Sequence, residues 1–487
     1  MKKILISLST VLAVSFISSC SFFNPKYDKP EIKTPELWHS QQTIKTNDID
    51  LTNLAWWRQF HDPTLNSLID TALRDNNQLQ VAIGSIVEAQ TEIDKANYGW
   101  LPTASVGGGG VIGQTFGTNY SSSVPNLNMP QSATFGGGAA GILPSYTINI
   151  VRQFKLGEIS RLSKKMQLNA KNAIRMSIIS QVVATYFSLL MANQQLELQQ
   201  EMVNKLDTLY VFYKREHEVG SDSAFSQHFL KQQLESQKGK IATIKNDIVH
   251  LQNSLRILTN KNPGDVSSYR KISDINANVE VPINLPSQVL LNRPDVAIAE
   301  YKLQSANANI GLARSQFFPS IDLTGTFGNA TLALGQLATF NAWAWAAQAA
   351  STVPIFNLSI LADTNKAKAQ FYQGYYDYID TLRKAFKDVD NSLSEHTAYL
   401  NNLDKQKNAL EAVYLQNKLY AKKFEVGDVS KADTVAISLN VINQEMEANQ
   451  AKLNTLVSIV NLYQALGSGY NVDNYNKPDY SNPAFNK

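Results

Sequence analysis

The chain has 487 residues, of which 44% are hydrophobic and 17% are charged. Its formal net charge of +3 is small, and no basic stripe with interleaved aromatic residues is present, which argues against a nucleic-acid partner. A single cysteine excludes an intramolecular disulfide and every metal or cluster site that needs several cysteines.

The first twenty residues form a targeting signal. Two lysines precede a mostly apolar run over residues 4–17, which is shorter than the ~20 residues that a membrane-spanning helix needs. The run ends in Ile-Ser-Ser-Cys, and its last residue is Cys20. This pattern resembles a bacterial lipobox, whose cysteine thiolate accepts a diacylglyceryl group before the signal is cleaved. We expect residues 1–19 to be a lipoprotein signal peptide and Cys20 to be the lipidation site.

The alternative is an ordinary secretory signal that happens to contain a cysteine. Ser21, rather than an aspartate, follows Cys20, which favours sorting to the outer membrane of a Gram-negative cell. No unbroken apolar run of 18 residues follows residue 20, so we expect no transmembrane helix in the mature chain. Membrane-spanning β-strands give a weaker signal and stay possible.

The mature chain reads as two copies of one unit. The segment Asn77–Pro102 matches Pro294–Pro319, and His217–Gly220 matches Phe424–Gly427. Each copy has the order helix, strand, loop, strand, very long helix, turn and long helix. We expect five segments after the signal peptide: a lipid-anchored extension (20–62), repeat 1 (63–262), a linker (263–290), repeat 2 (291–466) and a tail (467–487).

The first helices and strands follow from local signals. Asp62-Pro63 predicts a short helix, with aspartate as the N-cap and proline at the first helical position, and a second helix is expected over about 77–98. The strands of repeat 1, from Thr103 to about Gln114 and from about Ala133 to Ile150, are glycine-rich.

The strands of repeat 2 alternate more clearly. Apolar residues and Gly325 lie at odd positions over 321–327, and polar residues lie at even positions over 320–326. The return segment, about 341–353, places two tryptophans, two alanines and Val353 on one face, and Gln348 and Thr352 on the other. Such strands have one apolar and one polar face.

The remaining segments predict long packed helices. Residues of about 155–217 and 358–424 contain no proline and carry apolar residues at 3/4 spacing, as in a coiled coil. At ~1.5 Å per residue each helix would extend about 95–100 Å. The return arms, after each turn, repeat the same spacing.

Four strands per chain cannot form a membrane barrel alone, because an open sheet edge leaves backbone groups unpaired in lipid. Known closed barrels start at about eight strands. The chain must therefore oligomerise.

These features together resemble the outer membrane efflux proteins of the TolC type, and most closely their NodT/OprM-like lipoprotein branch. The resemblance covers nearly the whole mature chain, and the stretch from Arg293 to Pro319 is its most specific part. Residues Asn149–Gln153 lack the acidic residue and glycine that the family often has there, which leaves the strand-to-helix register of repeat 1 open. The matching segments are Cys20 with Tyr27–Pro30, Trp56–Leu65, Leu290–Val296, Ala306–Pro319, Pro354–Phe356 and Leu466-Gly467.

The resemblance implies a mainly α fold with a membrane β-barrel. Three copies, each with two tandem repeats, would form a twelve-stranded β-barrel continuous with a long α-helical barrel. Such a tube is a passive duct in the outer membrane that extends into the periplasm. Its implied partners are a periplasmic adaptor protein and an inner-membrane pump, often of the resistance-nodulation-division class.

The repeated turn is the main candidate site. Val219-Gly220 with Ser223, and Val426-Gly427 with Ser430, interrupt the long helices. A glycine allows the left-handed conformation that ends a helix, and a serine three residues later can cap the next helix. A helical turn is one interpretation, and the resemblance adds a second, in which these turns are the tips that contact the adaptor.

Asp433 lies where TolC-type channels carry an acidic ring at the periplasmic aperture. Three copies at one height would attract cations. The alternative is an ordinary surface aspartate. Repeat 1 has Ser226 at the matching position.

Other motifs fail. Gly108-x-Gly110-x-x-Gly113 fits a dinucleotide pattern but lies in a strand with no helix after it. The six histidines are not paired at metal spacing, and no serine or cysteine nucleophile has a motif around it. We expect no catalytic residue, metal or cofactor, and therefore no enzyme.

Rival functions stay open at this point. A non-porous coiled-coil lipoprotein of the periplasm would explain the heptads and Cys20, but not four alternating strands. Within the channel class, drug efflux, metal export and type I protein secretion are not distinguished, because the duct does not choose the substrate.

Overall fold

The structure is a computed structural model, and its contacts group the chain into two compact units. Unit 1 comprises Met1–Lys29, Val87–Lys164 and Tyr301–Tyr375, and unit 2 comprises Pro30–Ile86, Lys165–Glu300 and Tyr376–Lys487. Each unit therefore contains parts of both sequence repeats. The structure describes residues 26–30, 33, 38–39, 50–116, 132–220, 224–268, 270–277, 279, 281, 291–334, 338–354 and 356–472.

The first ordered elements are short. Two 3₁₀ helices, η1 (Leu51–Asn53) and η2 (Trp56–Phe60), precede α3 (Pro63–Asp75) and α4 (Asn77–Tyr98). The Asp62 side chain accepts hydrogen bonds from the backbone N–H groups of Thr64 and Leu65, at 2.9 and 3.1 Å. The predicted N-cap is therefore confirmed.

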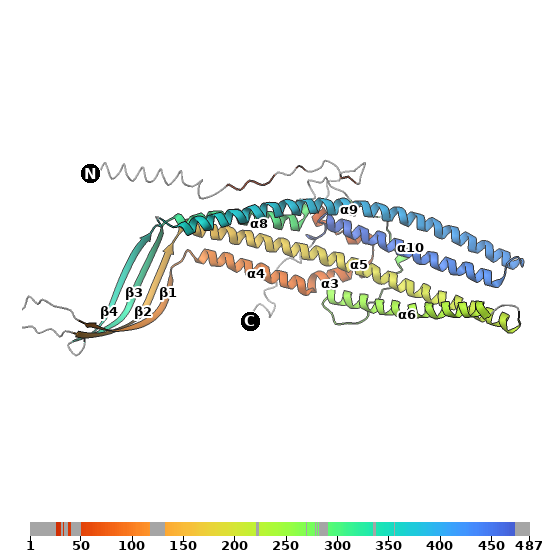
Figure 1. The fold of residues 1–487 in the computed structure, drawn as a ribbon, viewed down its shortest axis with the longest axis horizontal. Helices are drawn as coiled ribbons and strands as arrows, with labels where there is room; N and C mark the ends of the chain where they lie inside the picture. Colours follow the sequence, from red (N-terminus) through yellow and green to blue (C-terminus); the bar gives the residue numbers. More distant parts are fainter. Residues whose placement is uncertain are drawn as a thin grey trace, which may run out of the picture. The chain divides into compact units, whose positions relative to one another are not determined.

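All four expected strands form, and all belong to unit 1. They are β1 (Thr103–Phe116), β2 (Ser132–Ile148), β3 (Ser320–Leu334) and β4 (Ala338–Thr352). They form one antiparallel sheet in the order β1-β2-β3-β4 (Figure 1). Both strands of repeat 2 are longer than the alternation predicted, and Val353 lies just past the end of β4.

Helices α5 (Ile150–Glu218) and α9 (Leu358–Glu425) have 69 and 68 residues, which corresponds to about 100 Å each. Helix α5 starts two residues after β2 ends, and the Asn149 side chain accepts the Arg152 N–H at 3.0 Å. This defines the junction that the sequence left open. The remaining elements are α6 (Ala224–Leu258), η3 (Ile272–Asp274), α8 (Pro294–Arg314), η4 (Ser315–Phe317) and α10 (Lys431–Ala465).

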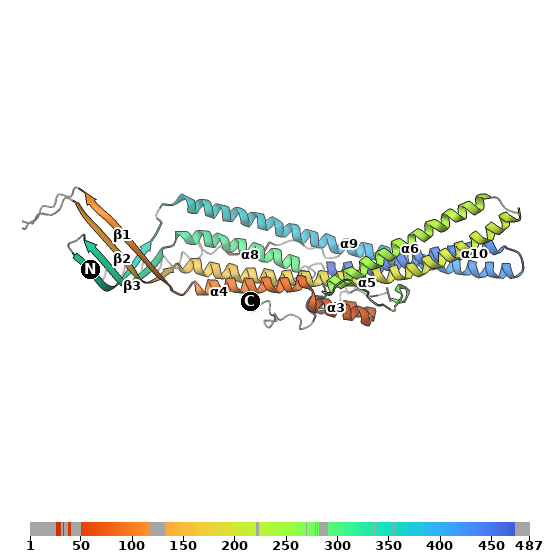
Figure 2. The same ribbon diagram turned by 90° about the horizontal axis from the view of Figure 1, so that it is seen from below.

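Unit 2 has a helical core. The Trp56 ring stacks on Tyr463 of α10 with centroids 4.9 Å apart, and Phe60 meets Phe187 of α5 edge to face at 4.9 Å. Further along, leucines of α5 and α6 pack with Ile442 of α10. Figure 2 shows the parts of α5, α6, α9 and α10 that belong to this unit running alongside one another. The apolar stripes that predicted a coiled coil are the buried faces of these helices.

The expected linker is partly core. Ile272 and Ile275 are fully buried, and Lys271 pairs with Glu197 of α5 at 2.8 Å. The Lys452 ammonium of α10 donates a hydrogen bond to the Ser273 carbonyl. Segment 271–275 therefore fastens α5 to α10.

Among the described helices, α5 alone has an 18-residue stretch apolar enough in composition to cross a membrane, and 61% of that stretch is buried. Such burial is typical of a core helix.

Candidate functional site

The sheet has one apolar face. Directly opposed residues of an antiparallel pair share a face, and the register places Leu323 opposite Ala349 and Phe327 opposite Trp345. The rings of Phe327 and Trp343 lie 5.8 Å apart, and Trp343 and Trp345 are 73% and 77% exposed. Tryptophans exposed to this extent fit a lipid-facing surface.

The other face is almost uncharged and is polar around the start of β3, while Leu143 and Val111 also lie on it. Thr324 lies opposite Gln348 on one side and Ser145 on the other. Asp322 lies opposite Thr147, whose hydroxyl donates a 2.7 Å hydrogen bond to the Asp322 carboxylate. The register thus separates apolar from polar residues as the alternation predicted.

The sheet has two free edges within the described residues. β1 pairs with β2 alone, and β4 pairs with β3 alone. In lipid, free edges need further strands, because their N–H and C=O groups find no water. A second copy of the same sheet can supply them.

The turn of repeat 1 follows α5 directly. Gly220 adopts a φ of 77°, and its N–H donates to the His217 carbonyl at 3.0 Å. Val219 is 76% exposed, and Ser223 lies outside the described residues. Helix α6 begins at Ala224, immediately after the predicted cap.

The turn of repeat 2 also has a left-handed glycine. Gly427 adopts a φ of 80°, and its N–H and that of Asp428 donate to the Phe424 and Lys423 carbonyls. These two bonds form the Schellman motif, which requires a left-handed residue. The prediction of positive φ at Gly220 and Gly427 is confirmed.

Ser430 and Asp433 are brought together in a capping box. The Ser430 hydroxyl oxygen accepts the Asp433 N–H at 3.1 Å, while the Asp433 carboxylate accepts the Ser430 N–H at 2.9 Å and its hydroxyl at 2.7 Å. These bonds from Ser430 hold the pKa of Asp433 below its usual value. The sequence analysis missed this partner, although Ser-x-x-Asp is the spacing that signals a capping box.

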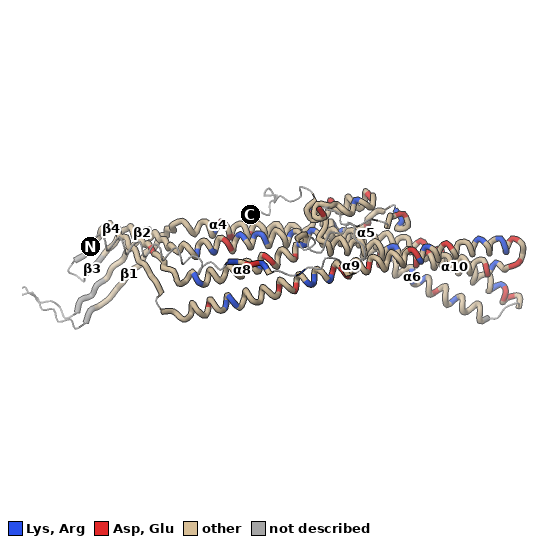
Figure 3. Tube along the Cα trace, turned by 90° about the horizontal axis from the view of Figure 1, so that it is seen from above, with Lys and Arg blue, Asp and Glu red and all other residues tan. Residues whose placement is uncertain are grey.

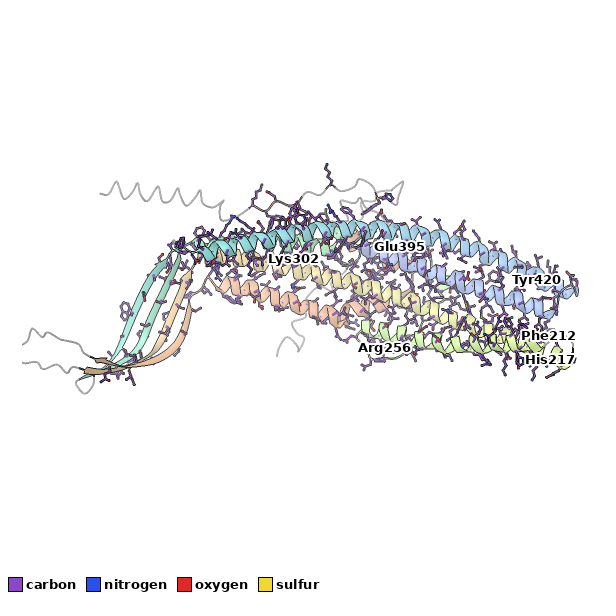
Figure 4. All side chains as sticks on the ribbon, in the orientation of Figure 1. Phe212, His217, Arg256, Lys302, Glu395 and Tyr420 are labelled. Carbon is purple, nitrogen blue, oxygen red and sulfur yellow. The ribbon has the colours of Figure 1, made fainter. Side chains whose placement is uncertain are left out.

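Both turns lie at the same end of unit 2, where the charged residues of the helices are also dense (Figures 1 and 3). Phe212 and His217 of α5 and Tyr420 of α9 lie close to these turns (Figure 4). The two predicted turns, as far as the structure describes them, therefore lie at the same end of this unit (Figures 1 and 2).

The surfaces around the two turns differ. In repeat 1, Phe225 and Phe229 of α6 are exposed and stack at 6.2 Å. The matching positions of repeat 2 are alanines, and Lys423 forms an ion pair with Asp428 at 3.0 Å.

Arg293 fastens the start of repeat 2 to its end. Its guanidinium donates to the Ala465 carbonyl at 2.9 Å and pairs with Asp295 at 2.8 Å and Asp388 at 3.3 Å. Although burial opposes it, the two carboxylates raise the pKa of Arg293. This residue belongs to the most specific stretch of the family resemblance and has a structural role here.

Metal-binding geometry is absent from the described residues, where no group of three or more His, Cys, Asp or Glu side chains could hold an ion. Cys20 lies outside the described residues.

Known proteins resemble the chain over nearly its full length. A probable outer membrane lipoprotein of Salmonella typhimurium, SilC, is 26% identical over 96% of this chain and 98% of its own length. The toluene efflux pump outer membrane protein TtgC of Pseudomonas putida is 27% identical over 96% of each chain. The solved Campylobacter jejuni CmeC outer membrane channel superposes with a TM-score of 0.77 at 23% identity, covering 95% of this chain and 97% of its own.

The family model described as "Outer membrane efflux protein" matches residues 68–261 and 285–468, which together exceed half of the chain. Each matched stretch covers most of one sequence repeat. The sheet with one apolar and one polar face agrees with an outer-membrane location, and both SilC and TtgC are named as outer membrane proteins. The chain therefore belongs to the outer membrane efflux protein family and is an outer-membrane component of an efflux system.

Proposed function

We propose that three copies of the chain form a passive duct through the outer membrane and into the periplasm. The observation that carries the proposal is the four-stranded sheet with one apolar face, one polar face and two free edges. Three sheets would give twelve strands, which exceeds the minimum of about eight in known closed barrels. The long helices would line the periplasmic part of the duct.

Two measurements test the duct together. Detergent-solubilised protein should have about three times the mature mass after correction for bound detergent. The same preparation should give single-channel conductance in planar lipid bilayers. A monomer that conducts no ions would contradict the proposal and would favour a non-porous scaffold instead.

Lipidation at Cys20 is the proposed second anchor. SilC, which is similar over nearly the whole chain, is named as a lipoprotein. Replacing Cys20 by Ala should abolish metabolic labelling with palmitate, whereas trimers should still assemble, because the barrel itself holds the protein in the membrane. Labelling that persists in the Cys20→Ala variant would show that the lipobox interpretation is wrong.

The partners in this proposal are a periplasmic adaptor, which binds the turns at Gly220 and Gly427, and an inner-membrane pump of the resistance-nodulation-division class. The exposed Val219 and Val426, 76% and 79% exposed, give the turns an apolar contact surface. Ser223 and Ser430 belong to the same turns, and Asp433 is the proposed aperture acid. Cross-linking from cysteines introduced at either valine should capture the adaptor in cells.

Drugs or other small toxic solutes are the proposed cargo, because TtgC is named for toluene efflux. Hypersensitivity of a deletion strain to a panel of organic compounds and metal salts would identify the class. Sensitivity to metals alone would favour metal export, and loss of a secreted protein would favour type I secretion.

A further inference from the structure

Asp322 is the single charged residue within the four strands. It is the third residue of β3 and lies on the polar face, where its neighbours are hydroxyl, amide and small side chains. The hydroxyl of Thr147 is its one side-chain partner among the described residues, at 2.7 Å. A fixed carboxylate therefore stands on an otherwise neutral polar surface.

The effect of the Asp322 charge depends on the face of the sheet on which it lies. A carboxylate on the lipid-facing side would be costly, and the register places it on the opposite side, with Thr324 and Gln348. If the sheets close into a barrel, symmetry brings the copies of Asp322 to one height. A ring of charges between low-dielectric walls raises the local concentration of counter-ions.

Two arginines lie near these strand ends in the chain. Arg152 is in the first turn of α5, and Arg314 is the last residue of α8. Neither arginine forms an ion pair with Asp322 in the described structure. There the Asp322 carboxylate accepts a hydrogen bond from the Thr147 hydroxyl. Among the described residues of its own chain, no cationic side chain therefore neutralises this carboxylate.

We infer that Asp322 determines the charge selectivity of the duct, by forming a ring of three carboxylates that favours cations over anions in the membrane-spanning section. This inference rests on the proposed function, since it needs a closed barrel. It concerns the membrane-spanning section alone, and Asp433 in the capping box of α10 stays the proposed aperture acid of the helical section.

The test is the reversal potential in a KCl gradient across a planar bilayer. Asp322→Asn should lower the K⁺/Cl⁻ permeability ratio about two- to threefold, with a larger effect at low salt, because the screening length grows as salt falls. Asp322→Glu should keep the wild-type ratio. Asp265→Asn, which removes the same charge from an exposed site in the segment after α6, outside the long helices, is the matched control and should change nothing.

A cysteine variant makes the test independent of how well the asparagine variant assembles. In a Cys20→Ala background, Asp322→Cys should react from water with a sulfonate-bearing methanethiosulfonate, and the reaction should restore cation preference. A reagent carrying a quaternary ammonium should shift the preference toward anions. Failure of both reagents to react would overturn the inference, because position 322 would then not face the aqueous lumen.

The outcomes separate the inference from the function on which it rests. The inference would be wrong if the Asp322→Asn channel kept the wild-type selectivity and the Asp433→Asn channel lost it. The proposed duct would still stand in that case, because all three proteins conduct. A trimer without any conductance would contradict both the proposed duct and the inference about Asp322.

Discussion

From α4 and α8 onward the two repeats have the same order of helices and strands, but they differ in which elements carry exposed aromatic pairs. In repeat 2 the strands carry Phe327, Trp343 and Trp345, whereas β1 of repeat 1 has a run of four glycines. After the turns the pattern reverses, because α6 of repeat 1 begins with the stacked Phe225 and Phe229 and α10 has alanines at the matching positions.

This difference separates what a repeat must keep from what it can change. The left-handed glycine and the buried stripe recur in both copies, because they determine where the backbone turns and how the helices pack. The exposed aromatic residues have little influence on where the backbone turns or on how the helices pack. We therefore expect substitutions at surfaces and at turns to have distinct effects.

The largest effect is expected on the apolar face of the sheet. Leu323→Arg places a charge toward lipid, which costs about 2–4 kcal/mol at the bilayer midplane and less toward the strand ends, where Leu323 lies. Thr324→Arg, one residue on, faces the polar side and should be tolerated better. Trimer yield in the outer membrane measures both variants. A greater loss with Thr324→Arg would show that the polar face contacts lipid.

Substitutions at the turns should affect export more than folding. Valine at a left-handed position costs roughly 1–2 kcal/mol, which is small for a large oligomer. We expect Gly427→Val and Gly220→Val to give normal trimers but drug or metal hypersensitivity, because the reshaped turn would no longer fit the adaptor. Normal export by both variants, with wild-type cross-linking to the adaptor, would show that the turns are structural only.

The capping box distinguishes the second turn from the first, which has Ser226 in place of Asp433. Asp433→Ala removes the carboxylate that accepts the Ser430 N–H and leaves the Ser430 cap itself in place, whereas Asp433→Asn removes the charge and keeps a hydrogen-bond acceptor. Export should persist in both variants. Only the alanine variant should slightly lower the thermal unfolding temperature. A changed ion leak in both variants would support the aperture role of Asp433.

The smallest expected effect is on the pH dependence of stability, and it comes from a lysine that is half-buried in repeat 2 and exposed in repeat 1. Burial beside Lys407 and Arg270 lowers the pKa of Lys452 to about 8, whereas its repeat partner Lys245 is exposed. The unfolded chain then binds more protons between about pH 8 and 10.5, so wild-type stability should rise with pH in this window.

Lys452→Met should remove that rise, and Lys245→Met should keep it. Solvent screening of this half-buried group limits the difference to at most ~2 kcal/mol. Thermal unfolding of the three proteins at pH 7.5 and 10 measures it. An equal pH trend in both variants would mean that Lys452 is not the source.

Several features of the site followed from short stretches of sequence. The Asp62-Pro63 pair predicted where α3 begins, and the glycines predicted both turns, because caps and left-handed positions depend on a few neighbouring residues. The period-two alternation predicted which residues of β3 share a face. The capping box at Ser430 and Asp433 was readable from its spacing but was not recognised.

Other features were decided by the tertiary structure. The pairing of β2 with β3, which makes one sheet from two repeats, joins segments separated by the whole of α5 and α6. The stacking of Trp56 on Tyr463, and the burial of Ile272 in the expected linker, likewise depend on contacts between distant parts of the chain. Local sequence determined caps, turns and alternating faces because their hydrogen bonds close within a few residues. The sheet order and the core needed the folded chain, since their partners are chosen by long-range packing.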